Sequence, residues 1–370
     1  MKVCYFINDI HYFKLHWLDR AKAANVAGYE VHILAGLNGC KEEDINLPAE
    51  FCLHPVMLKT TSHSFFNLIA VAYRASQVIN DLKPDVLHCI TIKPCLSRIL
   101  LRHSGKLIMS FPGLGRLFSG HRFMKRLLRK GICMGFRFAV RRNDCHLTFE
   151  HERDRAKLCS LAGISGEATR VIGVSGIDLN RFNYLPPSNN TTPVVLFAGR
   201  MLRTKGLDTL VKVCRRLRNS GVEFELHVAG LLMPDDPDAI PEHELRGWEE
   251  RGDIIWHGTC HEMPGLIAKS DIIALPTRYN EGVPRILIEA AACGRPSVAY
   301  DRGGCDVVLN QGMCGELVPD GDEDAFFHAL KKQICEPARR LSAGMAGRKR
   351  ATNLFSAEIA AKSMLECYNE

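Results

Sequence analysis

Two carboxylates, Glu281 and Glu289, lie on either side of a predicted helix start, a pattern that could bind a sugar nucleotide. The apolar run 271–276 reads as a short buried strand, and Gly282 and Pro284 then mark a turn into a helix. The free backbone N–H groups at such a helix start favour phosphate. One carboxylate could then bind ribose hydroxyls and the other the sugar. The alternative is a solvated helix with two unrelated acids.

A second segment with the chemistry to bind anions is 199–206, Gly-Arg-Met-Leu-Arg-Thr-Lys-Gly, between a predicted strand and a predicted helix. Arginine can clamp phosphate oxygens in a fork, and lysine acts as a point charge. Such fixed cations stabilise a diphosphate leaving group as its charge develops. We expect Arg200 and Lys205 to do this and Arg203 to be solvated, with a plain basic surface loop as the alternative.

Alternating strand-like and helical segments predict an α/β fold with parallel sheets. The polar, Pro-rich stretch 185–193 divides the pattern into two Rossmann-like domains, expected to face each other across a cleft. We predict one domain at 1–185, a second at 186–352, and a C-terminal helix within 353–370 that packs back on the first. Ligands of such sheets bind at the carboxyl ends of the strands.

Composition excludes several classes of protein. At 370 residues and 46% hydrophobic content the chain is long enough for two globular cores, and its 15 scattered cysteines are typical of reduced cytosolic thiols. No apolar run reaches the length that spans a bilayer, and the start turns polar too early for a signal peptide. Residues 1–185 carry 26 Lys and Arg against 15 Asp and Glu, whereas the rest carries 22 against 26. The two halves are therefore expected to meet different partners.

The spacing of Glu281 and Glu289 resembles the Glu-x7-Glu motif of family 4 retaining glycosyltransferases, which have the GT-B fold. Further motifs in the same order extend the resemblance through most of the C-terminal half: Gly199-Arg200, Lys205-Gly206, Ala229-Gly230, His257-Gly258, Leu275-Pro276, Gly303-Gly-Cys305 and 315–322. The sequences 281–285 and 301–306 are most similar to bacterial enzymes that extend undecaprenyl-diphosphate-linked surface glycans.

This resemblance implies roles for individual residues. Arg200 and Lys205 would bind the donor diphosphate, Glu281 the sugar hydroxyls, and Glu289 the ribose. The remaining donor-binding residues would be Gly282, Val283, Arg285, His257 and Gly258. Family members work without a divalent cation, so we expect no metal and no cofactor beyond the nucleotide-sugar co-substrate. Asp236-x-Asp238 has a spacing that could bind a metal, but it follows a predicted strand and is broken by two prolines, so we interpret it as an exposed acidic loop.

Three residues of the first half are candidate acceptor contacts: His16, Lys93 and Glu150. His16 corresponds to a histidine of relatives that assemble surface glycans, and the alternative is a capping or core histidine. Lys93 could pair with an acceptor phosphate. Glu150 could orient an acceptor hydroxyl or cap a helix. The loop 110–115 resembles the segment in which many family members place a histidine near the sugar, but this chain has none there.

From Arg116 to Arg142 the chain has nine Lys and Arg and no acid, interleaved with aromatic and aliphatic residues at helical spacing. This pattern is typical of a helix that lies in an anionic membrane surface, with Lys125, Arg126, Arg129 and Lys130 as its contacts. A solvated helix face and a nucleic-acid patch are the alternatives, although no nucleic-acid motif accompanies the run.

The best hypothesis is a retaining enzyme that moves a sugar, an N-acetylhexosamine, from a UDP-sugar to a lipid-diphosphate-linked saccharide at the inner face of the cytoplasmic membrane. One alternative is a GT-B sugar-nucleotide epimerase, which transfers nothing. Another is a non-catalytic two-domain binding protein.

Overall fold

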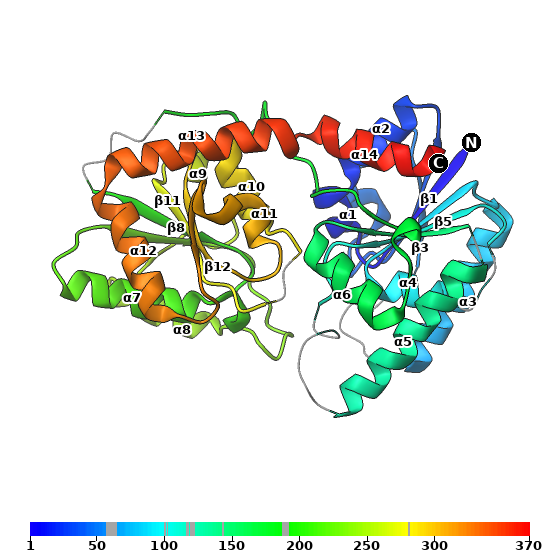
Figure 1. The fold of residues 1–370 in the computed structure, drawn as a ribbon, viewed down its shortest axis with the longest axis horizontal. Coiled ribbons are helices and arrows are strands. Elements are labelled where there is room, and N and C mark those ends of the chain that lie inside the picture. The colour runs from blue at the N-terminus through cyan, green and yellow to red at the C-terminus, as the bar shows by residue number, and fades with distance from the viewer. Residues whose placement is uncertain are drawn as a thin grey trace. The chain divides into compact units, whose positions relative to one another are not determined.

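The computed structural model describes residues 1–56, 65–99, 101, 103–115, 118, 123–142, 144–186, 192–279 and 282–370, without the side chains of 65–70 and 123–125. The chain forms two compact units, 1–176 with 357–370 and 177–356. Each contains a parallel sheet with helices on both faces (Figure 1).

The first unit has a seven-stranded sheet in the order β3-β2-β1-β4-β5-β6-β7. Its strands are β1 (Lys2–Ile7), β2 (Glu30–Ala35), β3 (Cys52–Pro55), β4 (Val86–Ile90), β5 (Lys106–Phe111), β6 (Cys145–Phe149) and β7 (Thr169–Val171). Its helices are α1 (Ile10–His16), α2 (Leu18–Val26), α3 (Phe65–Leu82), α4 (Ile92–Arg98), α5 (Phe123–Arg142), α6 (Glu152–Ala162) and α14 (Ala357–Asn369), with short 3-10 turns η1 (Glu42–Asp44) and η3 (Gly166–Ala168).

Side chains of β1 show why this sheet is buried on both faces. Cys4 and Phe6 belong to one apolar cluster, whereas Val3, Tyr5 and Ile7 belong to another. Alternate residues of a strand point to opposite faces, so each face needs its own layer of helices. The first cluster includes residues of α3 to α6, and the second includes residues of α1, α2 and α14.

The second unit has a six-stranded sheet in the order β10-β9-β8-β11-β12-β13. Its strands are β8 (Val194–Ala198), β9 (Glu225–Ala229), β10 (Ile255–Trp256), β11 (Ile272–Leu275), β12 (Ser297–Tyr300) and β13 (Gly315–Val318). Its helices are α7 (Leu207–Asn219), α8 (Glu242–Glu250), α9 (Met263–Ala268), α10 (Arg285–Ala292), α11 (Cys305–Leu309), α12 (Glu323–Cys335) and α13 (Pro337–Leu354), with 3-10 turns η4 (Arg203–Lys205) and η5 (Asn310–Gly312).

The boundary between the units differs from the one predicted at Leu185. The structure assigns 177–186 to the second unit, and two arginines of that unit, one of them buried, bind carbonyl groups of this segment. Arg295 donates to the carbonyls of Leu185 and Pro186 at 2.9 and 3.0 Å, and Arg348 donates to that of Phe182 at 3.0 Å. A polar, Pro-rich composition indicates a linker, but it cannot reveal that distant arginines fix part of it.

The C-terminal segment leaves the second unit after Ser356, and α14 then packs beside α2 of the first unit (Figure 1). Met364, Cys367 and Tyr368 of α14 are buried in the first unit's core. The helical pattern of residues 12–27 predicts one continuous helix, but the structure divides it into α1 and α2 at Trp17. Trp17 is buried, with the Arg20 guanidinium 4.6 Å above its ring.

Candidate active site

The sheet of the second unit reverses its strand order between β8 and β11, its two central strands. Strands β9 and β10 follow on the β8 side, and β12 and β13 follow on the β11 side. The loops that leave β8 and β11 therefore diverge at the carboxyl edge, where open α/β sheets bind their ligands. These loops contain both segments singled out in the sequence, 199–206 and the residues that precede α10.

Glycines allow the backbone to approach closely at this edge. Gly206 has a positive φ of 84°, and a Cβ there would lie 2.0 Å from the carbonyl oxygen of Pro276. A Cβ on Gly230 would lie 1.6 Å from the carbonyl oxygen of Gly199. Any other residue would push these loops apart. The glycines recognised in the sequence thus bring the ends of β8, β9 and β11 together.

Arg200 and Lys205 converge on one aromatic ring. The Arg200 guanidinium carbon lies 6.0 Å from the ring centroid of Tyr279, and the Lys205 ammonium nitrogen lies 5.5 Å from it. Both distances are within the range of cation–π attraction. Two cations beside one ring on the carboxyl edge make a concentrated positive site at the position where the topology places a ligand. Tyr279 was not singled out in the sequence, although its place just before Asn280 and Glu281 was the available signal.

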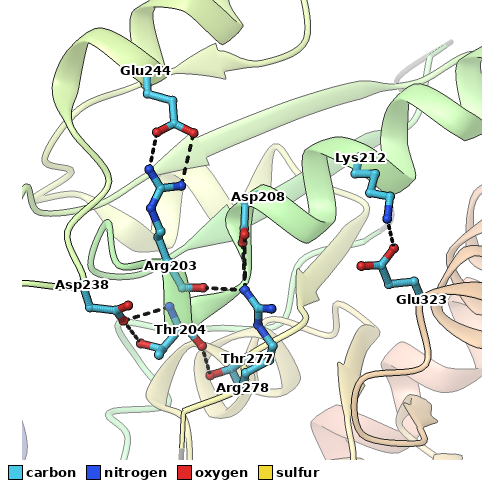
Figure 2. A network of polar contacts seen from close by, with 9 residues as sticks. All are labelled: Arg203, Thr204, Asp208, Lys212, Asp238, Glu244, Thr277, Arg278 and Glu323. Carbon is cyan, nitrogen blue, oxygen red and sulfur yellow. Dashed lines mark hydrogen bonds and ion pairs between the residues drawn. The ribbon is translucent and has the colours of Figure 1, made fainter.

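The side chain of Arg203 is 43% exposed, and it differs from a fully solvated cation because it is also paired. Its guanidinium makes two hydrogen bonds to the Glu244 carboxylate, at 2.6 and 3.3 Å (Figure 2). Asp238 also differs from an acid in a simply exposed loop, because its carboxylate accepts hydrogen bonds from both the backbone N–H and the hydroxyl of Thr204. The positive charge of Arg203 is therefore balanced locally, whereas Arg200 and Lys205 face the tyrosine ring.

The start of α10 contains Arg285 and Glu289, both assigned to donor binding. Pro284 is the N-cap, so the helix begins at Arg285, one residue later than the sequence indicates. Arg285 Nε donates to Glu289 Oε1 at 2.8 Å, and both side chains are largely buried. Burial raises the pKa of Glu289, and the positive charge of Arg285 opposes that shift. Glu289 is thus a buried carboxylate with one oxygen oriented by an arginine.

Of the motif residues that precede α10, the structure describes Gly282 and Val283 but not Glu281. Val283 is buried, and the Gly282 carbonyl accepts a hydrogen bond from Gly304 N–H at 2.8 Å, which joins this loop to the one after β12. Glu281 lies outside the described residues, so its predicted role stays a prediction.

His257 and Gly258 lie at the carboxyl end of β10. The backbone N–H of His257 donates to the carbonyl of Val228, and the Gly258 carbonyl accepts from Gly230 N–H at 2.8 Å. The His257 Nε2 atom lies 3.1 Å from Nδ1 of His227. Partial burial, followed by the neighbouring His227, lowers the pKa of His257. Its side chain is thus engaged with β9, and the predicted role of His257 and Gly258 in donor binding stays a prediction.

In the first unit, His16 and Glu150 lie in surroundings that share a buried arginine. His16 Nδ1 lies 3.3 Å from the hydroxyl of Ser175. Arg20, which is 2% exposed, donates to the carbonyl of Val174 at 2.7 Å. Burial lowers the pKa of Arg20, and the charge of the buried Glu150 opposes that shift. His16 and Arg20 thus contact the adjacent residues Ser175 and Val174 of the first unit.

Lys93 lies in α4, just after β4. The strand order of the first sheet reverses between β1 and β4. Asn8 Nδ2 donates to Thr91 Oγ1 at 2.8 Å across the two strand ends, and Thr91 has a positive φ of 73°. A β-branched residue with this backbone angle is strained, and such strain concentrates at functional sites. Partial burial lowers the pKa of Lys93, two residues further on. We did not predict a special role for Thr91 from the sequence, because the residue type does not reveal that its φ is positive.

Residues 123–142 of the basic run form α5, and the described side chains of this helix divide into two faces. Ile132, Cys133, Phe136 and Ala139 are buried in the core. Leu127, Met134 and Phe138 are exposed by 59%, 70% and 44% and follow each other at helical spacing. Arg126, Lys130, Arg137, Arg141 and Arg142 are also exposed. Arg129 differs from the prediction of a surface contact because it is half-buried and donates to the carbonyl of Phe118 at 3.3 Å. The side chain of Lys125 lies outside the described part.

Among the described residues, no group of three or more His, Cys, Asp or Glu could hold a metal ion. No described helix is long and apolar enough to cross a membrane.

Comparisons with known proteins agree with this architecture. Residues 2–140 match the family described as glycosyl transferase 4-like, and residues 192–335 match glycosyl transferases group 1. A D-inositol 3-phosphate glycosyltransferase of Salinispora tropica is 27% identical over 59% of this chain and 44% of its own length. A GDP-mannose-dependent alpha-(1-6)-phosphatidylinositol monomannoside mannosyltransferase of Mycolicibacterium smegmatis is 28% identical over 57% of this chain and 59% of its own. These alignments span about half of each curated relative.

Solved structures extend the likeness to the whole chain. Sucrose-phosphate synthase from Thermosynechococcus elongatus superimposes with a TM-score of 0.81 at 18% identity, covering 100% of this chain and 98% of the other. HepE from Anabaena, solved in complex with UDP-glucose, has a TM-score of 0.76 at 18% identity, covering 99% and 98%. The α/β GT-B fold predicted from the sequence is confirmed. The first half of the chain is therefore similar to glycosyl transferase 4-like proteins, and the second half is similar to glycosyl transferases group 1.

Proposed function

We propose that the protein is a retaining glycosyltransferase that moves a sugar, an N-acetylhexosamine, from a UDP-sugar to a lipid-diphosphate-linked saccharide. The observation that carries this proposal is the convergence of Arg200 and Lys205 on Tyr279 at the switch point of the second unit. A departing diphosphate gains negative charge, and preorganised cations stabilise that charge in the transition state. Because Arg200 and Lys205 supply the positive charge, the proposed reaction needs no metal ion.

The donor is held along the carboxyl edge in this proposal. Glu289 accepts hydrogen bonds from the ribose hydroxyls, and Arg285 orients its carboxylate. The backbone at His257 and Gly258 contacts the base, and Gly282 and Val283 pack beside the diphosphate. Glu281 binds the sugar. The UDP and UDP-glucose complexes of HepE, a protein of the same fold, support UDP as the nucleotide.

No second carboxylate is assigned as a nucleophile, so retention is proposed to proceed by attack on the face that the diphosphate leaves. The acceptor hydroxyl forms the new bond to the anomeric carbon while the bond to the diphosphate oxygen breaks. The acceptor proton passes to the departing phosphate, which stays beside Arg200 and Lys205. The products are the glycosylated acceptor and the nucleoside diphosphate.

The choice of a lipid-linked acceptor is supported by α5 of the first unit. Its exposed Leu127, Met134 and Phe138 form an apolar stripe flanked by exposed cations, while its other face is buried. Apolar side chains enter the acyl boundary of a bilayer, and cations bind anionic head groups. We propose that this helix holds the protein at the inner face of the cytoplasmic membrane, with His16, Lys93 and Glu150 near the acceptor.

Turnover measurements on three single variants test the leaving-group assignment. Arg200→Ala and Lys205→Ala should each lower kcat by about 10²–10³, the usual effect of removing one preorganised charge partner. Lys212→Ala is the matched control, because this exposed α7 lysine pairs with Glu323 instead and should leave kcat unchanged. UDP release that depends on the acceptor would distinguish transfer from epimerisation. Turnover close to wild type in both loop variants would refute the assignment.

A further inference from the structure

The cation loop 199–206 is fixed from one side by the loop that follows β9. Leu202 and Ala239 form an antiparallel bridge, and Arg203 N–H donates to the carbonyl of Asp238 at 2.8 Å. The Asp238 carboxylate reaches further, because its Oδ2 accepts from the backbone N–H and the hydroxyl of Thr204 at 3.0 and 2.5 Å (Figure 2). Asp238 therefore binds both the backbone and a side chain of the residue immediately before Lys205.

Thr204 also joins this loop to the segment after β11. Its carbonyl oxygen accepts from the backbone N–H groups of Arg278 and Tyr279, at 2.7 and 3.0 Å. Figure 2 shows Thr277 approaching the same carbonyl group. Tyr279 carries the ring on which Arg200 and Lys205 converge. One residue thus connects Asp238 on one side with the aromatic support of both cations on the other.

The negative charge of Asp238 distinguishes a positioning role from a direct electrostatic role in phosphate binding. A carboxylate near an anion site repels the anion, so a role through charge alone would weaken phosphate binding. Asp238 instead directs its Oδ2 at two donors of Thr204, which accounts for a negative group beside a loop that must attract phosphate. Arg203 is balanced in the same way by Glu244. These two acids therefore bind Thr204 and Arg203, within the loop itself.

We propose that Asp238 is a positioning residue that acts through Thr204 to hold Lys205 and Arg200 in the geometry that binds the donor diphosphate. This inference rests on the proposed function, because the diphosphate site at Arg200 and Lys205 is itself proposed. It assigns no ligand contact to Asp238. A hydrogen bond to a charged group is strong enough for its loss to reduce ligand affinity about tenfold to a hundredfold.

Calorimetric titration of the full chain tests the proposal with the diphosphate that wild type binds best among UDP, GDP and ADP, and with the matching nucleoside. Asp238→Asn and Thr204→Val should lower the affinity for the diphosphate about tenfold or more and leave the affinity for the nucleoside unchanged. Thr204→Ser keeps the hydroxyl and should retain wild-type affinity. Asp235→Asn, which removes an exposed acid from the same loop, is the control for charge.

A double variant separates positioning from a general loss of stability. In a Lys205→Ala background, Asp238→Asn should reduce the diphosphate affinity much less than in wild type, because the cation that it positions is gone. An undiminished loss in that background, or a gain in diphosphate affinity in Asp238→Asn, would overturn the positioning role.

The failure of the proposed function has a different signature. If wild type bound no diphosphate better than its nucleoside, and Arg200→Ala and Lys205→Ala changed nothing, the diphosphate site itself would be refuted. If those two variants weakened binding while Asp238→Asn and Thr204→Val did not, only the positioning role would be refuted. Melting curves of every variant establish that the comparison is made on folded protein.

Discussion

Glu289 is 8% exposed and its carboxyl group lies beside one guanidinium, and burial and this positive charge change its pKa in opposite directions. Burial disfavours the charged form and dominates, so the pKa lies above its ordinary value of 4.5. If the carboxylate accepts hydrogen bonds from ribose, nucleoside affinity should fall as the pH is lowered through that raised pKa. Titration of wild type and Glu289→Gln at several pH values should show this fall in wild type, and lower, pH-independent affinity in the variant.

The neighbouring Arg285 supplies the control for that experiment. Its charge lowers the pKa of Glu289, so Arg285→Gln should raise that pKa further and move the fall in affinity to higher pH. A raised folded pKa also makes the contribution of Glu289 to stability greatest below about 4.5, and that contribution is lost as the pH rises through the folded pKa. A shift of the binding midpoint to lower pH in Arg285→Gln would contradict this account of the site.

Helix α5 has two different faces. One face is buried in the core, and the other is an exposed basic and apolar surface. Lys130, Arg137 and Arg141 are the exposed cations that best test membrane binding, since Arg129 is bonded within the unit. Each cation near an anionic leaflet contributes about 1 kcal/mol, so replacing all three with Gln should weaken vesicle binding roughly a hundredfold. Co-sedimentation with vesicles that contain anionic lipid measures this change.

The matched control for α5 replaces three exposed lysines elsewhere, Lys157, Lys332 and Lys349, with Gln. It removes the same charge and should leave vesicle binding nearly unchanged. Wild-type binding should also resist salt in part, because burial of the apolar stripe is not screened. Equal losses in the two triple variants would show that the attraction is nonspecific and that α5 is only a solvated face.

Across the whole molecule, the chain crosses from the first unit to the second before Ile177 and returns after Ser356. These two residues form a parallel bridge, so both crossings leave the second unit at one place. The returning α14 completes the first unit's core, where the Tyr368 hydroxyl lies 2.7 Å from His88 Nδ1. The other ring nitrogen of His88 lies 2.6 Å from the Ser110 hydroxyl. The last helix is therefore part of the first unit's folding.

Removing the Tyr368 hydroxyl should destabilise the first unit selectively. Tyr368→Phe leaves one buried nitrogen of His88 without that partner, at a cost of about 1–3 kcal/mol. Hydrogen exchange should become faster in β4 and β5, while β8 and β11 keep their protection. Burial lowers the pKa of His88 to about 3. The stability that neutral His88 contributes is thus present above its ordinary pKa of 6.5 and declines as the pH falls towards 3. Equally faster exchange in both units would contradict this assignment.

The sequence by itself determined the α/β class, the two-sheet arrangement and the edge of the second sheet to which the cation loop and the motif helix belong. These features depend on local signals, such as apolar strands, helix periodicity and glycines where backbones meet, which residue type records directly. The carboxyl ends of parallel strands then share one edge whatever the details of packing.

Tertiary structure decided how the residues of that edge are used. Only folding brings Tyr279 beneath Arg200 and Lys205, pairs Arg203 with Glu244 and directs Asp238 at Thr204. It likewise assigns 177–186 to the second unit and bonds Arg129 of α5 to the carbonyl of Phe118. Each of these outcomes depends on contacts between residues far apart in the chain. The residue types permit many such pairings, and only packing selects among them, because a charged group becomes solvated or paired according to the neighbour that the fold supplies.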